Sequence, residues 1–152
     1  MEPSKPMKTF FHVGIVVEDI ERSMAELTAA LGVTWDEPHD SAYGPWKIRA
    51  TYSVDGPPFL ELVQGEAGGP WDTGKGSHLH HLGYWSDDVA GDSAALVQHG
   101  VAIDFDPGTV GRSGRFCYHL AKASGVRVEV VSASNRAQRE PGWVAPDAKE
   151  PG

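Results

Sequence analysis

Two histidines and two glutamates occupy matching positions in the two halves of the chain, and side chains of these types bind divalent metals. His12 precedes Glu61 by 49 residues (61 − 12), and His81 precedes Glu129 by 48 (129 − 81). Imidazole and carboxylate together suit Ni, Co, Zn, Fe(II) or Mn. An octahedral ion with four protein ligands keeps two positions for water or substrate, so the set predicts an open metal site of the catalytic kind.

An internal repeat gives these four residues equivalent surroundings. Residues 11–20 align with residues 80–89 at an offset of 69 (81 − 12), and residues 59–63 align with residues 127–131 at an offset of 68 (129 − 61). Similarity at a fixed offset indicates duplicated structural units. Each half is predicted to contain a strand, a helix and three more strands, which gives an α+β fold of two βαβββ modules.

Capping residues and apolar spacing locate the predicted elements. Asp19 is the expected N-cap of a helix that ends at Gly32, and Asp87 or Asp88 is the expected cap of a second helix that ends at Gly100. Strands are predicted at residues 10–17, 33–37, 46–54 and 59–64, and again at residues 81–85, 101–105, 115–121 and 126–132. The expected organisation is an N-terminal extension (1–9), a first module (10–74), a second module (75–132) and a flexible tail or dimer arm (133–152).

Alternation along the strands assigns the four residues to one face of the sheet. In the first strand Phe10, His12 and Gly14 should share a face, while Phe11 and its apolar neighbours should face the helix. A charged residue between strand formers costs several kcal/mol if it is buried without a partner, so Glu61 and Glu129 require water, a cation or a metal. By the same alternation, His80 is expected to point opposite His81, toward the helix.

Length, charge and cysteine content exclude several classes of protein. The chain has 152 residues and a formal net charge of −8, so it is not expected to bind nucleic acid or an anionic membrane. No apolar run approaches the roughly 18 residues of a membrane span, and the first eight residues lack the apolar core of a signal peptide. One cysteine, Cys117, excludes an internal disulfide, which favours a cytoplasmic protein.

The duplicated motifs resemble the vicinal oxygen chelate superfamily, which includes glyoxalase I, methylmalonyl-CoA epimerase, extradiol dioxygenases, and fosfomycin and bleomycin resistance proteins. The resemblance covers residues 10–132 and implies two modules that pair into a curved mixed sheet around a metal cavity. It also implies that His12, Glu61, His81 and Glu129 hold the ion. The motifs that carry it are His12-Val13-Gly14-Ile15 with Asp19-Ile20, His81-Leu82-Gly83 with Asp88-Val89, and residues 124–129.

The resemblance leaves three functions open. The first is an isomerase, epimerase or lyase, in which Glu129 or Glu61 removes a proton next to a metal-chelated carbonyl of a small oxygenated substrate. The second is an Fe(II)-dependent extradiol-type dioxygenase, and the third is a binding or resistance protein without turnover. A homodimer is expected as well. Substrate contacts are predicted for Arg127, Trp85, Trp46, Arg49, Arg115 and His119.

Overall fold

The computed structural model describes residues 7–110 and 114–145, and all eight of its strands belong to one sheet. The first module contains β1 (Phe10–Val16), α1 (Ile20–Leu31), β2 (His39–Tyr43), β3 (Trp46–Tyr52) and β4 (Phe59–Gln64). The second contains β5 (His78–Ser86), α2 (Val89–Gln98), β6 (Ala102–Phe105), η1 (Pro107–Val110), β7 (Phe116–Ala121) and β8 (Val126–Ser132), followed by η2 (Ala133–Asn135) and α3 (Arg136–Arg139). The predicted α+β fold of two βαβββ modules is confirmed.

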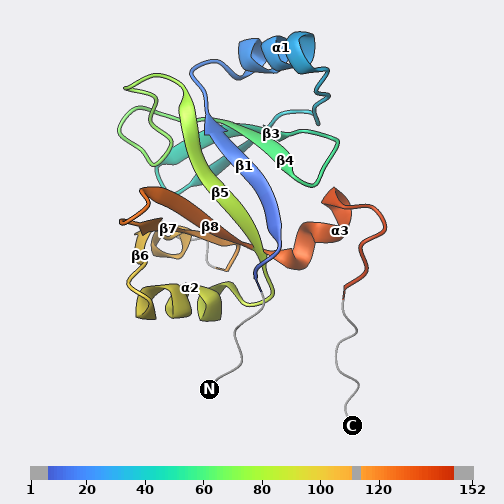
Figure 1. The fold of residues 1–152 in the computed structure, drawn as a ribbon. Helices are drawn as coiled ribbons and strands as arrows, with labels where there is room; N and C mark the ends of the chain where they lie inside the picture. Colours follow the sequence, from blue (N-terminus) through green and yellow to red (C-terminus); the bar gives the residue numbers. More distant parts are fainter. Residues whose placement is uncertain (1–6, 111–113, 146–152) are drawn as a thin grey trace.

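The two modules meet at the centre of the sheet. The strand order is β2-β3-β4-β1-β5-β8-β7-β6, with β1 antiparallel to β5. Within each module the first strand runs parallel to the last, β1 to β4 and β5 to β8. The sheet curls, and α1 and α2 lie outside its two halves (Figure 1). First and last strands of both modules are therefore the four central strands, and their inner faces surround one hollow.

Both helices begin and end where the sequence predicts. Asp19 caps α1 by accepting a hydrogen bond from the backbone N–H of Arg22 at 3.1 Å, and Asp88 caps α2 by accepting one from Gly91 at 3.0 Å. Gly32 ends α1 in the left-handed region, at φ 74°, where its N–H donates to the carbonyl of Thr28. Within the described ranges, no helix is long and apolar enough to cross a membrane.

One predicted strand of the first module is in the wrong place. Residues 33–37 contribute only an isolated bridge between Trp35 and Ser53, and the edge strand is β2 instead. Trp35 packs against the residues beneath α1, and its indole N–H donates to the carbonyl of Met24 at 3.2 Å. The apolar pattern that suggested a strand is therefore the pattern of a segment packed under a helix, while β2 is polar because an edge strand needs little apolar sequence.

The segment between the modules supplies a core residue to both of them. Trp71 is 2% exposed and packs in a cluster with Val63 from β4 and Phe116 from β7. Its indole N–H donates to the hydroxyl of Tyr118 at 2.9 Å. The linker therefore folds back into the concave side of the sheet and fills one part of it.

The predicted flexible tail or dimer arm packs on its own chain in the part that the structure describes, residues 133–145. The guanidinium of Arg139 lies 4.2 Å from the centre of the Tyr52 ring and pairs with Asp36. The indole N–H of Trp85 donates to Glu140 at 3.1 Å. Residues 146–152 and 1–6 lie outside the described ranges. The homodimer stays a prediction.

Candidate metal centre

The four predicted ligands converge on one point inside the curled sheet. Nε2 of His12 lies 3.0 Å from Nε2 of His81 and 3.0 Å from Oε1 of Glu129, and Nε2 of His81 lies 3.1 Å from Oε1 of Glu61. The other two imidazole to carboxylate distances are 3.4 Å. Adjacent ligand atoms bound about 2.1 Å from one ion lie about 3.0 to 3.4 Å apart, so the spacing is that of a metal coordination sphere.

All four ligands come from one chain and are buried. They belong to β1, β4, β5 and β8, and their ligand atoms lie within 4.8 Å of one another. Oε1 of Glu129 makes no hydrogen bond of acceptable geometry within the described ranges, although Nε2 of His12 is near. A buried carboxylate oxygen without a donor is costly. Since a divalent ion would satisfy it, the residues present fit a metal.

Each histidine lies over a glycine of the neighbouring central strand. In the antiparallel pair of β1 and β5, His12 is opposite Gly83 and Gly14 is opposite His81. A Cβ on Gly14 would come within 2.0 Å of the His81 ring, and one on Gly83 within 2.3 Å of the His12 ring. The motif of histidine, any residue and glycine therefore has a steric cause. Each of the two strands supplies one imidazole, and its glycine leaves room for the imidazole of the other strand.

Two bulges at equivalent positions overturn part of the predicted alternation. The pairing of β1 with β5 skips Phe11, and it skips His80 in the same way. Phe11 lies on the concave side, where its ring stacks on Trp85 at 3.8 Å. His80 turns toward Tyr118, with ring centroids 5.4 Å apart. The prediction that these two residues face the helices is wrong, because an extra residue in a strand shifts the face of its neighbours.

A proton on His12 partly compensates the two carboxylates of the site when no metal is bound. Burial alone lowers the pKa of His12, but the negative charges of Glu61 and Glu129 outweigh it and raise this pKa to about 9. Burial opposes the ionisation of Glu61, yet the two histidines hold its pKa well below the ordinary value. The metal-free site at neutral pH therefore contains an imidazolium between carboxylates.

Metal affinity is expected to rise with pH because the ion must displace this proton. Below pH 9, binding at Nε2 of His12 should release about one proton, so the apparent affinity should increase about tenfold per pH unit. Above this pKa the increase should stop. Competition with a chromophoric chelator between pH 6.5 and 8.5 measures the slope, and a flat profile would contradict the predicted protonation of His12.

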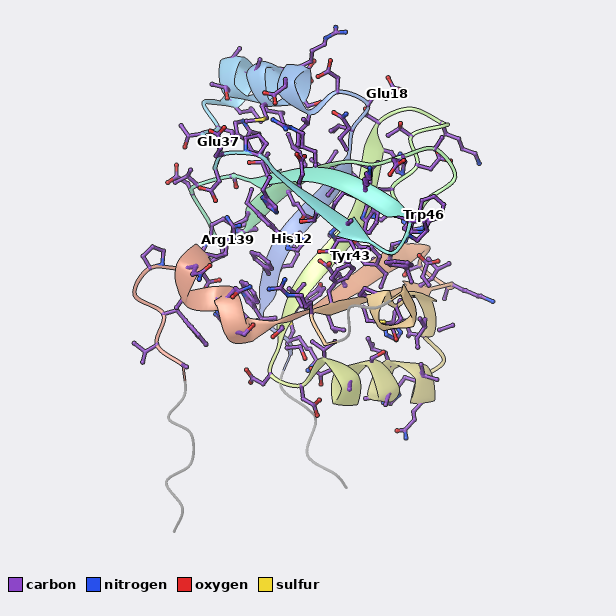
Figure 2. All side chains as sticks on the ribbon, turned by 180° about the vertical axis from the view of Figure 1, so that it is seen from behind. His12, Glu18, Glu37, Tyr43, Trp46 and Arg139 are labelled. Atoms are coloured by element: carbon purple, nitrogen blue, oxygen red, sulfur yellow. The ribbon has the colours of Figure 1, made fainter. Side chains whose placement is uncertain are left out.

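The two carboxylates of the candidate site, Glu61 and Glu129, line an aromatic cavity of about 290 Å³. Phe11, Tyr52 and Trp85 form one wall, while Arg139 on α3 and Arg115 also line the cavity. His12 lies in the middle of the molecule, between Arg139 on one side and Tyr43 on the other (Figure 2). Burial and the charges of both glutamates raise the pKa of Tyr52 well above its ordinary value, so its hydroxyl stays a donor beside Glu61, the residue opposite it in the pair of β3 and β4.

The structure brings only part of the predicted substrate-binding set into this cavity. Trp85 and Arg115 line it. Arg127 instead pairs with Asp104 at 2.8 Å and donates to the carbonyl of His80, and Arg49 pairs with Glu21 at 3.0 Å on the outside. Trp46, at the start of β3, packs at the edge of the core cluster and lies away from His12 (Figure 2).

His119 points to the opposite face of the sheet, toward α2. Its Nδ1–H donates to the carbonyl of Val101 at 2.9 Å, and its Nε2 accepts from the hydroxyl of Ser93 at 2.6 Å. The ring is fully buried. Its neighbour Tyr118 takes the cavity face, as alternation along β7 requires. His119 therefore has a structural place, and the prediction that it contacts substrate is not supported by its position.

Replacing His119 with Phe is expected to lower the free energy of unfolding by about 1 to 3 kcal/mol, because the Ser93 hydroxyl and the Val101 carbonyl lose their partner. Metal affinity should be unchanged. Urea denaturation and metal titration measure the two effects, with His99→Phe at the exposed end of α2 as the control. If His119→Phe lost metal affinity with an unchanged free energy of unfolding, His119 would belong to the functional site after all.

Sequence reasoning missed Tyr52, Tyr118 and Arg139. The two tyrosines are directly opposite Glu61 and Glu129 in the strand pairs, at corresponding positions of the two modules. Because the two tyrosines hold corresponding positions in the two modules, a comparison of the modules would have identified both of them. Arg139 follows the repeat in a short polar segment, and nothing in its pattern connects it to the cavity.

The duplicated modules and the four inward ligands define the class of protein. The chain belongs to the glyoxalase/bleomycin resistance protein/dioxygenase superfamily, whose family model matches residues 11–118. This confirms the resemblance drawn from the sequence motifs. No curated protein matches the chain with significance.

Solved structures with the same fold are distant in sequence. A variant of Streptomyces coelicolor methylmalonyl-CoA epimerase in complex with 2-nitronate-propionyl-CoA is 17% identical, with a TM-score of 0.61 over 85% of this chain and 99% of that chain. The Mycobacterium tuberculosis methylmalonyl-CoA epimerase is 19% identical, with a TM-score of 0.59 over 87% and 92%. A mutant Streptomyces coelicolor 4-hydroxymandelate synthase is 14% identical, with a TM-score of 0.61 over 86% of this chain but 49% of that one.

Proposed function

We propose that this protein is a divalent-metal-dependent isomerase, epimerase or lyase that moves a proton on the carbon next to a carbonyl of a small oxygenated substrate. The supporting observation is the set of two imidazole nitrogens and two carboxylate oxygens within 4.8 Å of one another. Four ligands on a six-coordinate ion leave two positions for neighbouring substrate oxygens. Ni, Co, Zn, Fe or Mn would suit this donor set.

The residues around the site have three proposed roles: to hold the ion, to enclose the substrate and to transfer a proton. A bound divalent ion would polarise the substrate carbonyl and so acidify the adjacent C–H. The aromatic wall of Phe11, Tyr52 and Trp85 excludes water and can hold a planar substrate against the site. His12 and His81, each held over a glycine of the neighbouring strand, would hold the ion.

Glu129 is the proposed base. A base must leave its resting contact to reach a carbon-bound proton, so the less restrained carboxylate is the better candidate. Oε1 of Glu61 lies 3.1 Å from Nε2 of His81 with hydrogen-bond geometry, whereas Oε1 of Glu129 makes no hydrogen bond of acceptable geometry within the described ranges. Glu61 would therefore be the anchored ligand of a bound ion, and Glu129 the carboxylate that takes the proton.

Hydrogen–deuterium exchange tests this function. The metal-loaded protein in D₂O is incubated with small 2-hydroxy ketones and with 2-substituted malonyl thioesters, and proton NMR follows loss of the signal next to the carbonyl. General-base removal costs about 10² to 10⁴ in rate, so Glu129→Gln should lose exchange to that extent. Glu61→Gln is the matched variant, expected to weaken metal binding first. Exchange that persists in both variants would contradict the assignment.

Two other functions from the sequence analysis predict different results. An Fe(II) dioxygenase would use His12, His81 and Glu129, and would consume oxygen with iron bound and a catechol-like substrate present. In that case Glu61 would occupy a coordination position that oxygen needs, which is why proton transfer is preferred. A non-catalytic binding protein would retain small aromatic molecules in the cavity without any exchange. Metal content of protein purified without added metal is the first measurement to make.

A further inference from the structure

A chain of three polar groups runs from the linker to the metal site. Nε2 of His80 lies 2.8 Å from the carbonyl oxygen of Pro70, and Nδ1 of His80 lies 2.8 Å from Nδ1 of His81. At the far side of its ring, Nε2 of His81 faces Oε1 of Glu61 at 3.1 Å and Oε1 of Glu129 at 3.4 Å. The contacts on either side of His80 are thus short enough for hydrogen bonds.

Only one arrangement of protons satisfies these contacts without a buried cation at His80. A carbonyl only accepts, so Nε2 of His80 must carry the proton shared with Pro70. His80 is 6% exposed, and its two ring nitrogens contact His81 and the carbonyl of Pro70 rather than a carboxylate, so a second proton on this ring would be an unpaired buried charge. Nδ1 of His80 is therefore an acceptor, and Nδ1 of His81 must supply the proton between them.

We propose that His80 is a positioning residue, which accepts the Nδ1–H of His81 and so holds this ring with Nε2 directed at the metal position. This deepens the proposed function, since it concerns a ligand of the same site. Metal-bound imidazoles usually donate their second N–H to a carboxylate or carbonyl, which fixes ring orientation and raises ligand basicity. Here a neutral histidine takes that role, and the backbone carbonyl of Pro70 orients it in turn.

The first module has no histidine at the position equivalent to His80. Phe11 occupies the bulge that corresponds to His80, and Nδ1 of His12 is buried without a hydrogen-bond partner in the described part of the chain. The two imidazoles therefore have different roles before metal arrives. The ring of His81 is thus oriented by a second histidine, whereas the ring of His12 has no such acceptor in the described part of the chain.

Three variants test this role. His80→Phe copies the residue of the first module, keeps an aromatic ring against Tyr118 and removes the acceptor. Loss of such an outer-shell partner costs about 10- to 100-fold in metal affinity. His80→Asn keeps an amide oxygen near the position of Nδ1 and should recover most of this loss. His78→Phe, on an exposed residue of the same strand, is the control.

Titration with Zn²⁺ or Co²⁺ gives the affinities, and ¹⁵N NMR of the imidazoles in the metal-free protein gives the tautomer directly. The expected result is a proton on Nδ1 of His81 in the parent and in His80→Asn, and a mixture of tautomers in His80→Phe. Parent affinity in His80→Phe, an absence of rescue by Asn, or an Nδ1 of His81 without a proton in the parent would each overturn the proposal. The tautomer is measured without metal or substrate, so this result is independent of the reaction.

Discussion

His81→Gln is expected to lose more than about 100-fold in metal affinity, since even the loss of an outer-shell partner costs about 10- to 100-fold. His81 is the better choice than His12 for this test. The imidazolium of His12 compensates one of the two buried carboxylate charges in the metal-free protein, and its removal would leave both uncompensated, at a cost of about 3 to 5 kcal/mol. Glutamine at residue 81 keeps a polar side chain of similar reach, so the metal-free chain should fold.

The measurement is the shift in thermal midpoint that Zn²⁺ or Co²⁺ produces. A ligand at 100 times its dissociation constant stabilises the folded state by about 2.7 kcal/mol, a shift that the parent should show and His81→Gln should lose. His78→Gln, on the same strand but exposed, should respond like the parent. A full metal-dependent shift in His81→Gln would mean that the quartet is a polar lining and that the ion binds elsewhere.

Gly14→Ala is expected to remove the metal site without changing any ligand. The new methyl group would lie within 2.0 to 2.5 Å of three atoms of the His81 ring, which is too close for contact, so the ring must leave its position. The cost in stability is about 1 to 3 kcal/mol, as for other overpacked interiors. Metal affinity should fall as far as in His81→Gln, because the imidazole would no longer reach Glu61 and Glu129.

Gly83→Ala is the reciprocal variant and should displace His12 in the same way, since its methyl group would lie within 2.3 Å of that ring. Gly74→Ala in the linker is the control, where the nearest atom is a carboxylate oxygen of Asp72 at 3.3 Å. Metal titration and urea denaturation of the three variants separate loss of the site from loss of the fold. Parent affinity in Gly14→Ala would show that His81 is not a ligand.

The repeat made the fold and the ligand quartet predictable, and local departures from regular structure account for what it missed. Period-two alternation placed His12 and Glu61 correctly, but no period contains the bulges that turn Phe11 and His80 inward. The strand predicted at residues 33–37 failed because apolar spacing cannot distinguish a strand from a segment packed under a helix. Arg139 reaches the cavity through a tertiary contact with Asp36, 103 residues earlier, which local sequence does not encode.

The anchoring of Trp71 also restricts how two copies of this chain can combine. Exchange of a whole module between copies requires the connecting segment to straighten and leave its own chain. That would withdraw an indole that is 2% exposed and would break its hydrogen bond with Tyr118. Burial of a large apolar side chain is worth about 1.5 to 3 kcal/mol, which each swapped chain would forfeit. The linker therefore opposes domain swapping and favours a complete site in every copy.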